Sequence, residues 1–208
     1  MDDELNRLGG DLSGKLGSKL AGFHVIRGEL TVEAARDHIR DVITLLKEDE
    51  TCRFGCLIDI CGVDYPEREE RFDIVYHLLS PWKNTRIRVK VKTDAETPVP
   101  SIVDIFPAAN WFEREASDLY GVVFDGHPDL RRILTDYGFE GHPLRKDFPL
   151  TGFVELRYDD EQKRVVYEPV QLMQDYRDFD YLSPWEAMET AIPGDEKASV
   201  VEEGEEKS

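Results

Sequence analysis

Cysteine is scarce in this 208-residue chain, and Cys52, Cys56 and Cys61 follow no spacing typical of a zinc or iron–sulfur site. Their odd number excludes a fully paired disulfide framework and favours a reducing compartment. All three fall in a largely apolar stretch, where a free cysteine behaves as a small hydrophobic residue. We therefore expect them to pack in a core rather than to bind a metal.

Long apolar runs and an excess of positive charge are also missing. No stretch approaches the roughly 20 apolar residues of a membrane span. The formal net charge of −18 argues against a nucleic-acid partner, because such binding neutralises phosphates with Lys and Arg, and against a polybasic membrane anchor. The acidic start, Met1-Asp2-Asp3-Glu4, resembles neither a signal peptide nor a transit peptide, so we expect the protein to stay in the compartment where it is made.

Recognisable catalytic and cofactor motifs are the third absence. The sequence has no G-x-S-x-G nucleophile turn, no phosphate-binding P-loop and no G-x-G-x-x-G dinucleotide fingerprint. Hydrophobic residues make up 40% of the sequence, so one domain of ordinary size with a substantial core is expected.

Apolar periodicity predicts the elements of the first half. Residues 1–21 predict a helix with one apolar stripe, weakened by four glycines. Thr31 is a suitable N-cap for a second helix running to residues 47–50. The predicted strands are residues 24–30, 54–63, 72–78 and 85–92.

The strand at 85–92 alternates apolar residues with four cations, Arg86, Arg88, Lys90 and Lys92. A solvated sheet face is the favoured interpretation. A docking face for an acidic partner is the alternative.

Residues 113–149 form the most unusual stretch, dense in acids, arginines, histidines, glycines and prolines. It follows a predicted short helix capped by Ser101, and it includes most of a second helix that begins near Asn110 and ends at Gly121. Gly-His-Pro occurs twice, at 126–128 and 141–143, each time with arginine soon after. Such a segment specifies a rigid, irregular backbone that carries many charges.

Three interpretations of these charges compete. In the first, His127, Asp129, His142 and Asp147 supply general acid and base while nearby arginines stabilise an anion. In the second, the two histidines converge on a metal. The third, which the spacing favours, is a structural network of ion pairs that locks the helix to the irregular segment and forms a rigid docking surface. Its candidate residues are Glu113, Arg114, Glu115, Asp118, His127, Asp129, Arg131, Arg132, His142, Arg145 and Asp147.

The protein is therefore expected to have an α+β fold, with a mixed, largely antiparallel sheet packed with helices and followed by an extended C-terminal arm. The expected units are an N-terminal helix (1–21), a core domain (22–152), an arm with a short hairpin (153–192) and a disordered acidic tail (193–208). The arm keeps aromatic residues without a core of its own, so we expect it to lie on another surface.

The central stretch also resembles a known family. Residues 113–134 read Glu-Arg-Glu-x-x-Asp-Leu-Tyr-Gly-Val-x-Phe-x-Gly-His-Pro-Asp-Leu-Arg-Arg-Ile-Leu, and residues 136–149 read Asp-Tyr-Gly-Phe-x-Gly-His-Pro-Leu-Arg-Lys-Asp-Phe-Pro. Both resemble the hallmark of the thirty-kilodalton subunit of respiratory complex I, the NADH:quinone oxidoreductase. The resemblance spans roughly residues 22–190, and only the two ends depart from it.

This resemblance implies a non-catalytic structural subunit of the hydrophilic arm, supporting NADH-to-quinone electron transfer coupled to proton translocation. It implies no cofactor and no metal in this chain, since FMN, iron–sulfur clusters and quinone belong to other subunits. The implied partners are the forty-nine-kilodalton subunit and the subunit that bears the terminal iron–sulfur cluster. The implied location is peripheral, on the cytoplasmic face of the bacterial inner membrane, or alternatively on the mitochondrial matrix side. A related membrane-bound hydrogenase-type complex is the alternative assembly.

Overall fold

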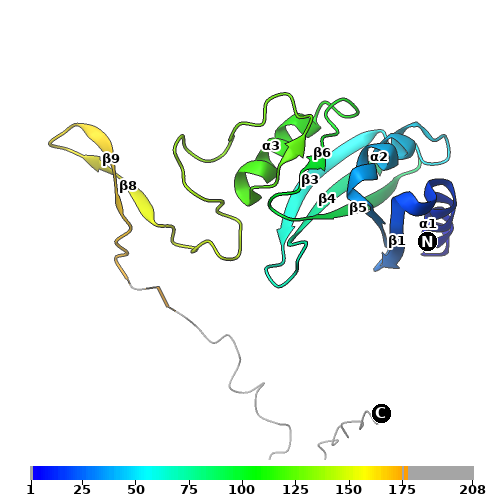
Figure 1. Cartoon of the computed structure of the whole chain (residues 1–208), viewed down its shortest axis with the longest axis horizontal. Helices are drawn as coiled ribbons and strands as arrows, with labels where there is room; N and C mark the ends of the chain where they lie inside the picture. Colours follow the sequence, from blue (N-terminus) through cyan, green and yellow to red (C-terminus); the bar gives the residue numbers. More distant parts are fainter. Residues whose placement is uncertain (1, 175, 178–208) are drawn as a thin grey trace, which may run out of the picture.

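A computed structural model describes residues 2–174, 176 and 177 of the protein, and its central element is a five-stranded mixed sheet (Figure 1). The strand order is β1-β2-β5-β4-β3, and only β2 and β5 run parallel. This confirms the expected fold class of a largely antiparallel α+β protein. The strands are β1 (Leu20–Ile26), β2 (Glu29–Ala34), β3 (Cys56–Asp64), β4 (Phe72–Ser80) and β5 (Thr85–Thr93).

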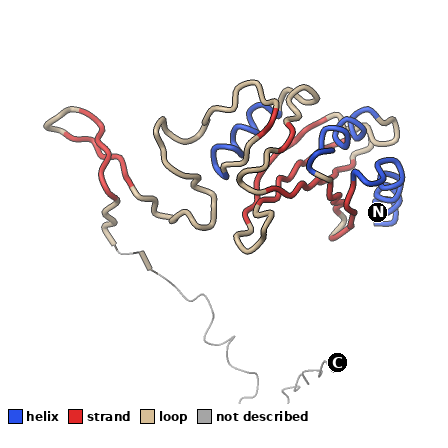
Figure 2. Tube along the Cα trace, in the orientation of Figure 1, coloured by secondary structure: helices blue, strands red, loops and turns tan. Residues whose placement is uncertain are grey.

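Three α-helices contribute to the layer on one face of this sheet (Figure 2). They are α1 (Asp2–Leu16), α2 (Ile39–Glu48) and α3 (Ala109–Tyr120). Phe23 packs under Gly9 of α1 and pairs across the strands with Val32. The ring of Tyr120 in α3 covers Gly62, whose cross-strand neighbour is Ile74. Since paired residues share a face of the sheet, these contacts place α1 and α3 on the side that forms the main core. The buried residues of α2 belong to the same core cluster.

The N-terminal helix does not stand alone. Its apolar stripe of Leu5, Leu12 and Leu16 is buried within the same core cluster as the sheet. Packing therefore stabilises a segment whose four glycines make it a weak helix on its own.

The predictions for residues 24–38 were only partly right. Arg27 and Gly28, with φ of 55° and 75°, form a turn between β1 and β2, so the expected single strand is two antiparallel strands. Two consecutive positive φ values suit a two-residue hairpin turn. The helix expected after Thr31 begins only at Ile39, because residues 29–34 pair with both β1 and β5.

The helix predicted at Ser101 is also absent, and residues 103–105 form a turn there instead. The expected core packing of the cysteines holds only for Cys52, because Cys56 is exposed and Cys61 is half-buried. Strand β3, which contains Cys56 and Cys61, has a bulge between Leu57 and Asp59. The bulge changes the face of the sheet to which the following residues point.

Beyond the sheet, β6 (Val99–Pro100) and β7 (Phe124–Asp125) form a short parallel pair that flanks α3 in the sequence. The expected hairpin is present as β8 (Val154–Asp159) and β9 (Arg164–Pro169), and it projects away from the body (Figure 1). The rest of the predicted arm beyond residue 177, and the acidic tail, lie outside the described residues.

Candidate functional site: the ionic module around helix α3

The ionic module is defined here as α3 together with residues 125–149, and Asp118 is its main anchor. The buried Asp118 carboxylate accepts the backbone N–H groups of Ile133, Leu134 and Thr135 at 3.1, 2.8 and 2.9 Å. It also receives the Thr135 hydroxyl and the guanidinium of Arg132, the latter at 3.0 Å. Burial alone raises the pKa of Asp118, yet these hydrogen bonds outweigh it and hold the pKa well below its usual range. Asp118 is therefore ionised and fully engaged.

Two arginines extend this anchor to the irregular backbone. Arg132 donates to the carbonyl oxygen of Gly141 at 3.1 Å in addition to Asp118. Arg114 donates from Nε to the carbonyl of Arg131 at 2.9 Å and from Nη2 to that of Arg132 at 3.1 Å. The helix and the irregular segment are thus joined through backbone carbonyl groups as well as through Asp118.

Both histidines of the module hold the backbone. His127 accepts the N–H of Asp129 at Nδ1 (3.1 Å), so the other nitrogen carries the proton and donates it to the carbonyl of Asn110 (3.0 Å). His142 donates from Nδ1 to the carbonyl of Asp118 at 2.8 Å. Burial, with help from nearby Arg145 and Arg132, lowers the pKa of His142. Among the described residues, neither His127 nor His142 belongs to a group of three or more potential metal ligands.

The C-terminal end of α3 is packed tightly against this segment. Gly121 ends the helix with φ of 77°, and its N–H bonds to Ser117 at 2.8 Å. A Cβ atom there would lie 2.5 Å from Nε2 of His142 and also collide with Arg145. Arg145 donates to the carbonyl of Tyr120 at 2.6 Å. A glycine is required both by the left-handed conformation and by the close approach.

A second anchor, which sequence analysis missed, ties the module to the sheet. Asp64, at the end of β3, accepts both Arg71 and the backbone N–H of Lys146, the latter at 2.7 Å. Arg71 also reaches Asp147 at 3.0 Å. The hydrogen bonds from Arg71, opposed by burial, lower the pKa of Asp64. The signal that was available is the acid that ends a largely apolar strand, with an arginine seven residues later.

Glu113 behaves differently from its predicted role. Within the described residues no arginine or lysine forms an ion pair with it; its carboxylate accepts the Ser101 hydroxyl at 2.6 Å and the N–H of Ile102 at 2.8 Å. Burial raises the pKa of Glu113 to about 7 against these two hydrogen bonds. The missing helix at Ser101 has its explanation here, because Glu113 organises that segment as a turn.

The remaining predicted residues face outward. Asp129 and Arg131 form an exposed pair at 2.9 Å, and Glu115 is exposed on α3. The predicted residues thus divide into an internal set that fixes the backbone, the exposed Asp147 that pairs with Arg71, and an outward-facing set formed by Glu115, Asp129 and Arg131.

The comparisons with known proteins agree with this geometry. The family model described as "Respiratory-chain NADH dehydrogenase, 30 Kd subunit" matches residues 32–154. A protein of Xanthobacter autotrophicus, named as the C subunit of an NADH-quinone oxidoreductase, is 63% identical over 199 residues, covering 96% of this chain and 95% of that protein. A protein of the same name from Maricaulis maris is 61% identical over 198 residues, covering 95% and 99% respectively.

The chain belongs to the thirty-kilodalton subunit family of respiratory complex I. The resemblance noted in residues 113–149 is therefore confirmed. A solved structure is also similar to this family member, with a TM-score of 0.60 and 29% identity over 71% of this chain and 86% of the other. It is described as part of the membrane-bound sulfane sulfur reductase, an archaeal respiratory membrane complex. None of the described helices of this complex I subunit is long and apolar enough to cross a membrane.

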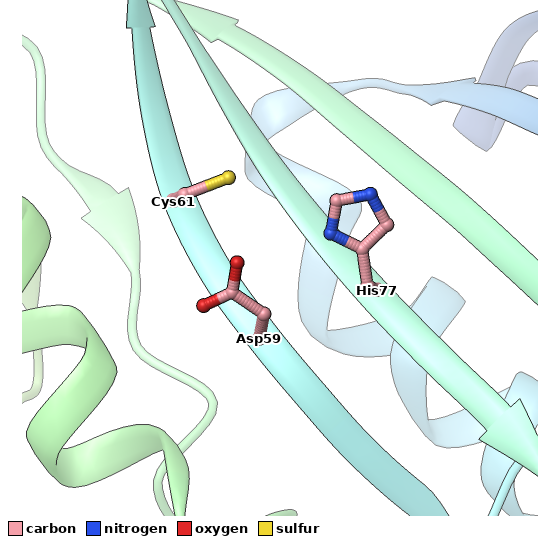
Figure 3. Close-up of side chains that lie close together, drawn as sticks. All are labelled: Asp59, Cys61 and His77. Atoms are coloured by element: carbon pink, nitrogen blue, oxygen red, sulfur yellow. The ribbon is translucent and has the colours of Figure 1, made fainter.

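One further cluster in this complex I subunit resembles a metal site in composition. Asp59 and Cys61 of β3 point toward His77 of β4, and their potential ligand atoms lie within 4.8 Å of one another (Figure 3). However, Nε2 of His77 accepts a hydrogen bond from Nε of Arg88 at 3.1 Å, so the proton resides on the other ring nitrogen. A metal-bound histidine instead donates its second N–H, and a guanidinium repels a cation. This arrangement does not suit a metal.

The cationic strand β5 of this subunit is largely neutralised by its neighbours. Arg88 pairs with Glu29 at 2.7 Å, and Lys92 with Glu33 at 3.3 Å. Lys90 lies 3.8 Å from the buried carboxylate of Asp73. The polar face of the sheet, which no described helix covers, thus carries a ladder of opposite charges between neighbouring strands.

Proposed function

We propose that this protein is a non-catalytic structural subunit that braces its neighbours in the hydrophilic arm of complex I. The observation that carries this proposal is the state of the groups that might otherwise do chemistry. Asp118, His127 and His142 each form hydrogen bonds with backbone groups of the module itself, and Asp118 also binds the side chains of Arg132 and Thr135. In this proposal the polar groups of the module fix the backbone conformation and do not form an active site.

The proposed partners are the forty-nine-kilodalton subunit and the subunit that bears the terminal iron–sulfur cluster. Two exposed surfaces support protein contacts: the set Glu115, Asp129 and Arg131, and the projecting β8–β9 hairpin. Side chains of this hairpin such as Leu156, Tyr158 and Tyr167 are more than half exposed, which is unusual for a free surface. We infer that the assembled complex covers them.

The proposal includes the absence of any cofactor or metal in this chain, with FMN, iron–sulfur clusters and quinone held by other subunits. The proposed location is peripheral, on the cytoplasmic face of a bacterial inner membrane, with the mitochondrial matrix side as the alternative. The bacterial sources of the similar NADH-quinone oxidoreductase subunits support the first of these.

A related membrane-bound hydrogenase-type complex is a second candidate assembly. The similarity to the archaeal sulfane sulfur reductase complex favours it only distantly, at 29% identity against 63% for the named complex I relative. Partner identification separates the two, because a complex I assembly would contain an NADH-oxidising flavoprotein.

The test is to purify the complex through a tag on this protein and to compare variants with exposed side-chain changes. Arg131→Ala and Glu115→Ala should lower the yield of assembled complex while leaving turnover per assembled complex unchanged. Asp118→Ala should lower assembly further, because it also removes the internal anchor. Normal assembly with lost turnover would overturn the proposal, as would a stoichiometric metal or a saturable substrate of the isolated protein.

A further inference from the structure

An apolar hollow of about 480 Å³ lies between the 136–140 loop and the root of the hairpin, outside the charged residues discussed above. Its walls are mainly the rings of Tyr137, Phe139, Phe148, Phe153 and Tyr167. The loop and the neighbouring Phe148 belong to the family motif at 136–149. The internal network reaches this surface through Arg132, whose guanidinium lies 5.9 Å from the centre of the Phe139 ring, but this contact does not explain the other rings.

The floor of the hollow is a fixed aromatic stack. Phe148 stacks on Phe139 with ring centroids 5.8 Å apart and meets Phe153 edge-on at 5.4 Å. The backbone of Gly141 approaches Phe148 so closely that a Cβ would lie 3.1 Å from its ring. The hollow is therefore preformed, which lowers the ordering cost of filling it.

Its rim carries two acidic side chains. Asp136 and Glu140 both line the hollow, both are exposed, and neither forms an ion pair with any other described residue. In contrast, the buried acids of the module each have several donors. Two exposed carboxylates beside an exposed tyrosine ring form a site that suits a cation, since Arg pairs with carboxylates and stacks on aromatic faces.

We propose that this hollow receives an apolar side chain of a neighbouring subunit, flanked in that subunit by an arginine or lysine that pairs with Asp136 or Glu140. The inference rests on the proposed structural role and specifies where one contact is made. Large apolar anchors beside a desolvated ion pair are the usual centres of stable interfaces.

A protein segment fits this surface better than a small molecule does. Binding pockets for small molecules bury most of their ligand. Here the walls are themselves open, since Tyr137 is 96% exposed, Phe153 66% and Tyr167 64%. The apolar lining also continues along the hairpin through Val154 and Leu156, so a covering protein would bury both surfaces together.

The first experiment measures how much of this protein stays with the complex, purified through another subunit, as the salt concentration of the wash rises. Tyr137→Ala should lower the retained fraction at least about tenfold at a fixed salt concentration, because it removes the exposed wall. The double variant Asp136→Lys with Glu140→Lys should dissociate at lower salt. The matched control, Glu67→Lys with Glu69→Lys, reverses two exposed acids that do not line the hollow and should behave as wild type.

The second experiment replaces Tyr137 with a photo-crosslinking amino acid in the full chain within the complex. The crosslinked peptide should come from another subunit and contain an apolar residue next to Arg or Lys. Wild-type retention of both variants, or a crosslink only to this protein itself, would overturn the inference while leaving the proposed function intact. Failure of the wild-type protein to co-purify would instead refute the proposed function. A small molecule that native mass spectrometry finds on wild type, and not on Tyr137→Ala, would also overturn the inference.

Discussion

The Oε2 atom of Glu113 lies 4.0 Å from Nε2 of His127, and both side chains are completely buried. This is not an ion pair, because the proton on Nε2 of His127 is directed to the carbonyl of Asn110. The nearby hydroxyl of Tyr76 is buried without a hydrogen-bond partner in the described part of the protein. Glu113 therefore has two neutral donors and no bonded cation, which explains why burial dominates its protonation.

The first prediction concerns pH. The pKa of Glu113 is about 7 in the folded protein and near its ordinary value of 4.5 when unfolded. Between these values the folded state binds more protons, so Glu113 makes the free energy of unfolding fall as pH rises, by roughly 3 kcal/mol in total. Above about pH 7 its contribution is constant. Glu113→Gln should remove this dependence, as measured by urea unfolding from pH 5 to 8.

The control for this experiment is Glu115→Gln, which changes an exposed acid on the same helix. Burial lowers the pKa values of His77 and His142, and both therefore contribute in the opposite direction, with stability that increases as pH rises toward 6.5. The relevant quantity is therefore the difference between variant and wild type. Parallel stability curves for Glu113→Gln and wild type would contradict the prediction.

The second prediction concerns Asp118. Asp118→Asn keeps the shape of the side chain but replaces one acceptor oxygen with an NH₂ donor. The groups that donate to Asp118 are Thr135, Arg132 and three backbone N–H groups, and one oxygen cannot accept from all of them. Leaving buried donors unsatisfied should cost about 2–4 kcal/mol of unfolding free energy. Asp129→Asn is the control, since the exposed pair with Arg131 is worth less than about 1 kcal/mol. Equal stabilities of the two variants in chemical denaturation would show that Asp118 is not the anchor.

Local sequence signals predicted the elements whose identity depends on nearby residues. The alternation in residues 85–92 and 72–78, the turn of the β8–β9 hairpin and the glycine that ends α3 are all confirmed. Residues 32–34 were mistaken for helix because Val32 fits a helical period with Ile39 and Val42. The pairing of this segment with β5, which is distant in the sequence, decides its conformation, and no local pattern contains that information.

The same distinction applies to the candidate site. The charged residues of 113–149 were found because they are dense, and their division into internal and exposed sets follows from burial that spacing does not show. The link of Asp64 and Arg71 to the module was missed because Lys146 and Asp147 lie far along the sequence from them. The aromatic hollow was missed because its walls come from three separate segments that meet only in the fold.

The third prediction compares two glycines with nearly equal backbone angles. Gly121 and Gly126 have φ of 77° and 79°, so an alanine at either position bears a similar strain of about 1 kcal/mol. A Cβ at Gly121 also collides with His142 and Arg145, whereas one at Gly126 meets nothing within 4 Å. Thermal unfolding should therefore show Gly121→Ala to be less stable than Gly126→Ala by about 1–3 kcal/mol. Equal losses would mean that the packing of α3 against residues 142–145 is looser than described.

The final prediction concerns the joint between module and sheet. Arg71→Lys keeps the charge but loses the bidentate hydrogen bond to the buried Asp64 carboxylate. We therefore expect the free energy of unfolding to fall by about 1–3 kcal/mol. Arg131→Lys, at an exposed pair, should change it by less than about 0.5 kcal/mol. A double-mutant cycle with Asp147→Asn separates the two partners of Arg71. Because Asp147 is exposed, its coupling energy should be below about 1 kcal/mol, and a larger value would place the joint at Asp147 instead of Asp64.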